Sequence, residues 1–232
     1  MKDNIIGLTV GIKYAKSFRI PDIAGDIIDN ILYSDKTPFG ADFFPEMQEN
    51  SRREKTLYNS VTEEYLRINT DDLILGIVVN KNFEKKYAWI RDDIFNYFKN
   101  VLFKEYQLKN IKRIGIIFSH KIGKNKNLDQ AVNLLTENKI NDTENINISF
   151  SKKDSVVEAL YRKGVSDYKN AIYNFIEIKE ATLASLDYQY YYDPAPEDLR
   201  ECFTEKVFDD AKSFLEKNYY SWLNNYEAKK DK

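Results

Sequence analysis

Hydrophobic and polar residues alternate near the start of the chain. Apolar side chains occupy every second position from Ile6 to Tyr14, and small or charged residues fall between them. This period of two predicts a β-strand with one buried face. Apolar residues then recur at helical spacing behind Pro21, which predicts a helix over residues 20–31.

The first half continues with two more predicted elements. Residues 65–70 and 73–79 are apolar runs on either side of Asp71 and Asp72, which predicts a hairpin. Residues 90–102 then place Ile90, Ile94 and Phe98 on one side of a long helix. The first half is therefore strand, helix, hairpin, helix.

The second half repeats this order at a constant offset. Adding 108 to a position pairs Ile6 with Ile114, Gly7 with Gly115, Tyr65 with Tyr173 and Leu75 with Leu183. We therefore predict an internal duplication with units at residues 1–108 and 109–232. The fold class that follows is α+β: two pseudo-repeated units, each with a mainly antiparallel sheet and helices on one face. The pattern leaves open whether the two sheets merge.

In the second half the offset predicts a strand near residues 114–118, a helix near 128–135 and a hairpin at 173–178 and 183–192. A closing helix follows from Phe203 to Trp222, after an insertion that contains Pro194 and Pro196. Residues 34–60 and 143–169 fit the repeat least and stay largely unassigned, apart from a short helix predicted over residues 154–160.

Composition excludes several classes of protein. The chain has 232 residues, 43% hydrophobic and 31% charged, with one cysteine and one histidine. These two residues cannot supply an intramolecular disulfide or a structural zinc site. The longest apolar run, residues 73–79, is far shorter than the roughly 20 residues that cross a bilayer. With no signal-peptide pattern at the N-terminus, we expect a cytoplasmic protein.

The single histidine and the single cysteine both have structural interpretations. His120 occupies the position of Ile12 in the other half, on the strand face that carries Phe118. This placement favours a partly buried histidine at a strand end over a catalytic acid or base. Cys202 lies beside Phe203 on the apolar side of the last helix, where a free cysteine is typically part of the core.

One short motif points to metal chemistry. Asp167 is followed ten residues later by Glu177-Ile178-Lys179, which resembles the D…E-x-K signature of the PD-(D/E)xK nucleases. In that family two carboxylates hold a divalent metal, and a lysine orients or activates water. The resemblance therefore implies catalytic roles for Asp167, Glu177 and Lys179 and a Mg or Mn cofactor. Against it, such triplets are common on solvated strands, and the repeat counterpart of Glu177 is Asn69.

Charge is unevenly distributed although the net charge is −2. Residues 104–126 hold seven basic residues and one acidic one, whereas residues 187–210 hold eight acidic and two basic residues. Two interpretations stay open: two solvated faces, or complementary surfaces that steer a partner or a second copy. The candidate binding residues in the basic stretch are Lys109, Lys112, Arg113, Lys121 and Lys124.

Tyrosines also alternate in one predicted strand. Tyr188, Tyr190 and Tyr192 share a side of it with Leu186, while Asp187, Gln189 and Tyr191 occupy the other side. These three tyrosines either cover a sheet face or form an exposed surface for a protein partner. We count them among the candidate binding residues.

Two strands carry a family resemblance. Residues 113–120, R-I-G-I-I-F-S-H, follow an aromatic-rich predicted helix, and residues 186–190, L-D-Y-Q-Y, precede another. They resemble a sporadically distributed family of uncharacterised bacterial proteins that shows R-I-G-L-R-Y-I-N and L-D-I-D-x-Y strands, although several positions differ. The resemblance implies a bacterial origin and the patchy distribution of defence or mobile-element genes. It transfers no functional residue.

Two functions from different classes follow. The first is a non-catalytic interaction protein without a cofactor, which binds a protein partner or itself through its charged and tyrosine-rich surfaces. The second is the metal-dependent nuclease. Nucleic acid is the less favoured partner under the first hypothesis, because the chain has no overall basic field, and no membrane association is expected.

Overall fold

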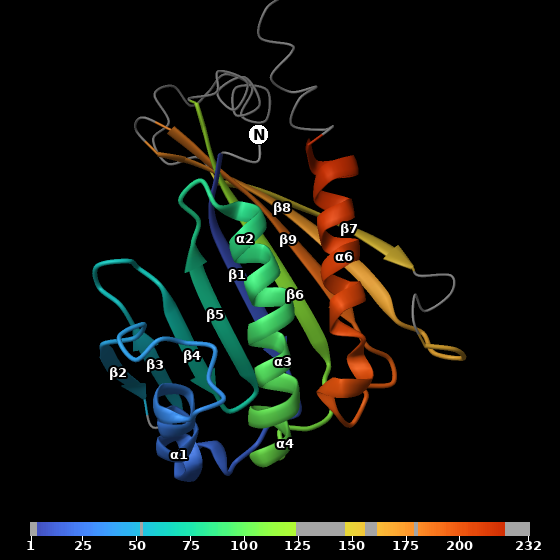
Figure 1. Ribbon diagram of the computed structural model, residues 1–232. Coiled ribbons are helices and arrows are strands. Elements are labelled where there is room, and N and C mark those ends of the chain that lie inside the picture. Colours follow the sequence, from blue (N-terminus) through green and yellow to red (C-terminus); the bar gives the residue numbers. More distant parts are fainter. Residues whose placement is uncertain (1–3, 52, 124–146, 156–161, 179–180, 221–232) are drawn as a thin grey trace, which may run out of the picture.

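A computed structural model shows a mixed α and β architecture built on one nine-stranded antiparallel sheet (Figure 1). The structure describes residues 4–51, 53–123, 147–155, 162–178 and 181–220. The strands run in the order β2-β3-β4-β5-β1-β6-β9-β8-β7. Their bounds are β1 Ile5–Lys13, β2 Glu46–Ser51, β3 Glu54–Tyr58, β4 Tyr65–Asn69, β5 Asp72–Val78, β6 Arg113–Gly123, β7 Asn147–Ser155, β8 Tyr168–Ile178 and β9 Ala181–Tyr191.

The centre of the sheet is the antiparallel pair β1 and β6. Val10 lies opposite Ile116, and Ile12 lies opposite Ile114. Because these apolar positions face the same side, pairing the two strands forms one continuous buried stripe. Outward from this pair lie β5 and β9, then β4 and β8, then β3 and β7, and β2 lies outside β3. Strands from both halves of the chain therefore share one sheet, a point that the sequence left open.

Three helical segments of the described part of the chain pack with the sheet. Helix α1 is Ile20–Tyr33, and residues 83–105 form a second segment with π-helical turns at Trp89–Ile94 and Phe98–Leu102 between α2 (Phe83–Ala88), α3 (Phe95–Tyr97) and α4 (Phe103–Glu105). A 3-10 turn, Leu199–Cys202, precedes α6 (Thr204–Phe214), which continues as π-helix over Leu215–Tyr219. Figure 1 shows residues 83–105 and α6 side by side in front of the sheet.

Aromatic contacts join the helices to the sheet and to each other. The Tyr87 ring stacks on Phe118 of β6 with centroids 5.9 Å apart. Its hydroxyl donates to the Phe208 carbonyl oxygen of α6 over 2.6 Å, and Phe95 contacts the Phe208 ring at 4.7 Å. Helix α1 is held by a 2.7 Å hydrogen bond from the Tyr97 hydroxyl to Asn30. Burial of these rings supplies most of the driving force for docking the helices.

The structure confirms many predicted elements and corrects others. Strands and helices occur near residues 6–14, 20–31, 65–70, 73–79, 90–102, 114–118, 173–178 and 183–192, as the sequence predicts. Strands β2, β3 and β7 were not predicted. The short helix predicted over residues 154–160 is wrong at its start, since residues 154–155 belong to β7, and its remainder lies outside the described residues. The helix predicted near residues 128–135 also lies outside them.

Within the described residues, every helix is too short or too polar to cross a lipid bilayer.

Candidate functional site

The two faces of the central strands differ in burial and in chemistry. On one face the side chains are buried and mainly apolar, as at Val10, Ile116 and Leu186. Side chains at the alternate positions are mostly partly exposed and mostly small or polar. We call this second set the open face. In the described central strands its members include Thr9, Gly11, Lys13, Arg113, Gly115, Ile117, Ser119, Ser185, Asp187, Gln189, Tyr191, Tyr168, Asn170, Ile172 and Asn174.

A row of cations and tyrosines crosses one end of the open face. Lys13 lies opposite Arg113, Arg113 opposite Tyr191, and Tyr191 opposite Tyr168 in adjacent strands. The two tyrosine rings stack with centroids 4.5 Å apart and an interplanar angle of 8°. The Arg113 guanidinium lies 5.6 Å from one ring and the Lys153 ammonium 4.2 Å from the other. Cation–π contact at both ends holds this row in one arrangement.

Hydrogen bonds continue the row into the middle of the open face. The Tyr191 hydroxyl donates to Oε1 of Gln189 over 2.8 Å, and Nδ2 of Asn170 reaches the same oxygen at 3.4 Å. Nε2 of Gln189 donates to Oδ2 of Asp187 over 2.6 Å. Burial raises the pKa of Asp187, while Gln189 and Arg113 act in the opposite direction. A linked network of this kind presents donors and acceptors in fixed positions.

Glycines keep the adjoining part of the open face flat. A Cβ at Gly11 would lie 3.6 Å from the nearest atom, and one at Gly115 would lie 3.8 Å from Asp187. Both are ordinary contact distances, so packing does not require glycine at either position. Gly76 differs, because the Tyr65 ring lies over it and a Cβ there would meet the ring at 2.2 Å. Glycine inside a strand often marks a close approach by another molecule.

The predicted tyrosine surface is wrong. Tyr188, Tyr190 and Tyr192 are buried on the face opposite the open one. Their hydroxyls bond within the molecule: Tyr188 to Asp210 of α6, Tyr190 to Asp167 at 2.9 Å, and Tyr192 to the Cys202 carbonyl at 2.9 Å. Burial raises the pKa of Tyr192 well above its ordinary value. These rings are core elements with satisfied polar ends and are not available to a partner.

The predicted basic residues separate in space. Arg113 lies on the open face, while Lys112 and Lys121 are exposed at opposite ends of β6. Lys109 forms a 2.6 Å ion pair with Glu197, which raises the pKa of the ammonium. Lys124 lies outside the described residues. The basic stretch of the sequence therefore does not form one continuous patch among them.

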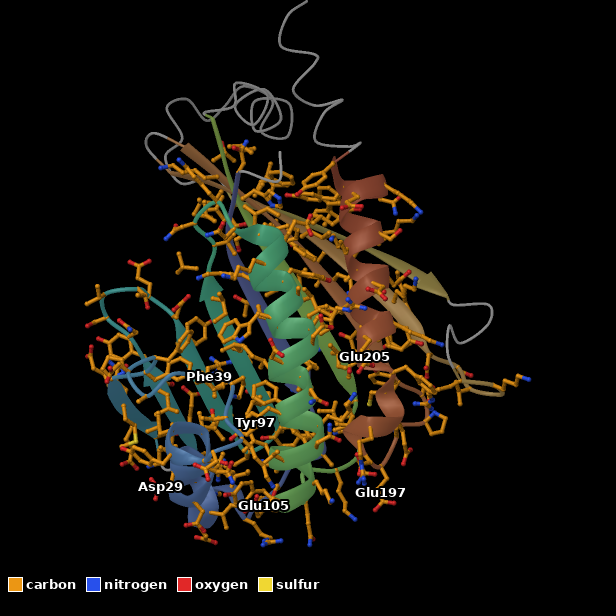
Figure 2. The ribbon with its side chains drawn as sticks, in the orientation of Figure 1. Asp29, Phe39, Tyr97, Glu105, Glu197 and Glu205 are labelled. Carbon is orange, nitrogen blue, oxygen red and sulfur yellow. The ribbon has the colours of Figure 1, made fainter. Side chains whose placement is uncertain are left out.

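Most residues of the acidic stretch form ion pairs within the chain. Glu205 of α6 pairs with Lys99 at 2.6 Å and Asp209 with Arg91 at 3.2 Å, both across to the neighbouring helical segment. Figure 2 shows Glu205 between these helices and Glu197 near the lower end of the molecule. Five of the eight acidic residues form ion pairs with described residues: Glu197, Asp198, Glu205, Asp209 and Asp210. One of these pairs, Lys109 with Glu197, joins the basic stretch to the acidic one. The interpretation of the two stretches as surfaces that steer a partner stays a prediction.

The residues of the nuclease signature do not converge. Asp167 precedes β8 and Glu177 lies near its far end, ten residues away, or about 33 Å at the rise of an extended strand. Asp167 is buried and accepts hydrogen bonds from the Tyr190 hydroxyl and the Asp193 amide, both at 2.9 Å. Lys179 lies outside the described residues. Because metal ligands must lie within about 2.6 Å of one ion, Asp167 and Glu177 cannot share a metal.

His120 and Cys202 are both buried. His120 faces the core, and its ring lies 5.2 Å from that of Tyr219. Burial lowers its pKa from 6.5 to about 4, so the imidazole is neutral at pH 7. Cys202 is buried in the 3-10 turn that precedes α6, and burial raises the pKa of its thiol. The structure confirms that both belong to the core. Cys202, however, lies in the turn before the last helix and not in the helix itself.

A surface pocket of about 470 Å³ lies on the helical side of the molecule. It is lined by Lys36, Pro38, Trp89, Asp93, Asn96, Tyr97, Asn100 and Val101. The aromatic residues that line it also stabilise the fold. Trp89 packs on Phe39 and Phe43, and the Tyr97 hydroxyl donates a hydrogen bond to Asn30. Figure 2 labels Phe39, in the segment after α1, and Tyr97, in α3.

The sequence does indicate which side of β9 is the open face. Leu186 and Tyr188 alternate onto the buried side of the strand, whereas Asp187 and Gln189 are on the same side as Tyr191. The apolar and polar neighbours, and not the number of rings, indicate which tyrosine is exposed. The contributions of Tyr168, Asn170 and Lys153 depend on strand pairing and have no signal in the local sequence.

No known protein-family model matches the chain, and no curated protein matches it. Among solved structures, the chain is similar to Methanococcus jannaschii TBP, with 12% identity over 90% of this chain and 98% of that one and a TM-score of 0.27. This likeness is too slight to indicate a shared function. The resemblance to the uncharacterised bacterial family stays a prediction.

Proposed function

We propose that the protein is a non-catalytic binding protein that recognises a protein partner with its open face. The observation that carries this proposal is the ordered network that links Arg113, Tyr191, Gln189 and Asp187 across β6 and β9. Tyrosine, serine, asparagine and glycine, with arginine, are enriched in antibody paratopes, which bind proteins by adaptable hydrogen bonding around rigid rings.

The surroundings of the network support the same proposal. The helical segments at residues 83–105 and 204–219 pack on the buried face, through Phe118 and Tyr188 respectively. We infer that the described helices all lie on that side and leave the other side to a partner. The alternative of a nucleic-acid partner is less favoured, because acidic residues interrupt the cations of the open face and a phosphate backbone needs a continuous basic surface. These are Asp187 and Asp72, which lies in β5 opposite Lys13.

We also infer that the two halves are structural repeats. The offset of 108 carries β1 into β6, much of β4 into β8, and much of β5 into β9. These pairs occupy matching places on either side of the sheet centre. The bacterial origin, the link to defence or mobile-element genes and the cytoplasmic location stay predictions.

Affinity capture with surface variants tests the proposal. Asn170→Arg adds a long charged side chain to the middle of the open face, and Asn218→Arg makes the same change at an exposed position of the last helical turn. Each tagged variant is expressed in the source organism, its fold is checked by thermal unfolding, and captured proteins are quantified by mass spectrometry. We expect one protein to be retained equally by wild type and Asn218→Arg and reduced about tenfold or more by Asn170→Arg.

Two results would contradict the proposal. In the first, the captured proteins are the same for all three baits. In the second, wild type enriches nothing over an untagged control.

A further inference from the structure

Among the described residues, no strand pairs with the outer side of the edge strand β7. On the β1 side of the sheet centre, four further strands follow in the order β5, β4, β3 and β2, whereas on the β6 side only β9, β8 and β7 follow. No described strand occupies the place next to β7 that β2 occupies next to β3. Figure 1 shows β7 at this margin of the sheet. The backbone groups on the outer side of such a strand are a template for pairing with another strand.

Five successive residues of β7 are also exposed. Ser149, Phe150, Ser151, Lys152 and Lys153 are all exposed in the structure. The Phe150 ring is 44% exposed although it stacks on Tyr173 with centroids 4.9 Å apart. Lysines at an edge often prevent pairing. An incoming strand must therefore place uncharged or acidic residues opposite them.

The sequence of β7 is complementary to itself when two copies pair in antiparallel fashion. Centred on Ser151, such a pairing uses all nine residues of Asn147–Ser155. It places Phe150 opposite Lys152 and Ser149 opposite Lys153, so no two like charges face each other. A lysine beside an exposed ring adds a cation–π contact, and cross-strand pairs of this kind stabilise sheets. Moving the centre to Lys152 would bring two lysines face to face and leave the ends of the strand unpaired.

We propose that the chain forms a two-fold symmetric dimer through β7, in which the two sheets join edge to edge. The occupant of the edge is a second copy, because the full-length register that avoids like charges is generated by β7 itself. Isologous pairing of this kind closes after two subunits. The dimer pairs the backbone of the outer edge of β7, whereas the proposed binding function rests on the side-chain network of β6 and β9, so the two can be tested separately.

Cysteine cross-linking tests the register directly. Ser151→Cys places two thiols opposite each other across the symmetry axis, where paired strands have Cα atoms about 4.5–5.5 Å apart, within disulfide range. Ser149→Cys, on the same side of the same strand, places its two copies four residues out of register, roughly 13 Å apart along the strand. The native Cys202 is buried, so wild type serves as the background.

We expect Ser151→Cys to form a covalent dimer under mild oxidation at least tenfold faster than Ser149→Cys, and wild type to sediment as a dimer. Phe150→Lys should shift sedimentation toward the monomer, while Phe203→Lys, the same change at an exposed ring of another element, should leave the dimer intact. Circular dichroism checks the fold of each variant. A wild-type protein that sediments as a monomer at all concentrations, or equal cross-linking rates for the two cysteine variants, would overturn the proposal.

Discussion

The Tyr190 hydroxyl donates a hydrogen bond to Oδ2 of Asp167 over 2.9 Å, and both side chains are buried. The carboxylate also accepts from the Asp193 amide at 2.9 Å and lies 3.8 Å from the Arg162 guanidinium. Asp167 therefore anchors the segment that follows β9 to the start of β8. These partners explain why the Asp167 carboxylate can be buried, and the explanation requires no metal ion.

Removing the Tyr190 hydroxyl should destabilise the protein. Tyr190→Phe leaves one lone pair of a buried carboxylate unsatisfied, so we expect a loss of about 1–3 kcal/mol in the free energy of unfolding measured with urea. The control is Tyr191→Phe on the adjacent residue, whose hydroxyl is on the partly exposed open face, and its expected cost is about 0.5 kcal/mol. Equal costs for the two variants would show that Asp167 does not depend on this bond.

Two substitutions in α6 should separate the contribution of packing from that of ion pairs. Phe208 is fully buried and contacts Phe95 and Tyr87, so Phe208→Ala should cost about 3–5 kcal/mol. Glu205→Gln removes a partly exposed ion pair with Lys99 and should cost less than about 1 kcal/mol. Denaturant unfolding measures both, and a larger cost for Glu205→Gln would contradict the account of how the helices dock.

His120 should make stability depend on pH. Burial holds its pKa at about 4, below the ordinary 6.5, so between these values the unfolded chain binds more protons than the folded one. Stability contributed by the neutral ring is complete above pH 6.5 and is lost as pH falls toward 4, by about 3 kcal/mol in total. Urea unfolding at several pH values should show that His120→Phe loses less stability over this range than wild type. Parallel pH profiles would mean that the imidazole is accessible to water.

Alanine should affect stability differently at two glycines. Gly76→Ala would drive a methyl group into the Tyr65 ring and should lower stability by roughly 1–3 kcal/mol. Gly11→Ala has room for its methyl group and should leave the melting temperature unchanged or slightly raised, because alanine loses less backbone entropy on folding. A melting temperature that falls equally for both variants would show that Gly11 is required by the fold and is not kept for close approach of a partner.

The elements that the sequence could predict are those with a buried face of regular period. The alternation through Leu8, Val10 and Ile12 predicts β1, and the apolar spacing through Ile90 and Ile94 predicts the second helical segment. The two outermost strands on the β1 side of the sheet, β2 and β3, lack that signal. In β3 only Leu57 is buried, and described side chains of β2 are exposed, so their pairing depends on neighbours that local patterns do not reveal.

The candidate site was predicted only in part. Arg113 was among the predicted binding residues, but its neighbours on the open face come from β7, β8 and β9 and meet only through strand register. The charge separation seen in the sequence was interpreted as two surfaces, although folding brings Lys109 to Glu197. Charged residues far apart in the sequence can form ion pairs in the folded chain, and the net charge of a sequence segment does not reveal such pairs.

Site-specific photocross-linking tests the central claim, that the open face binds a protein partner, most directly. A photoreactive side chain is placed at Asn170 on the open face or, as the control, at Asn218 on the last helical turn, and the cells are irradiated before lysis. We predict a cross-link from position 170 to one other protein and none to that protein from position 218. A cross-link to the same protein from position 218, or none from position 170, would contradict the claim.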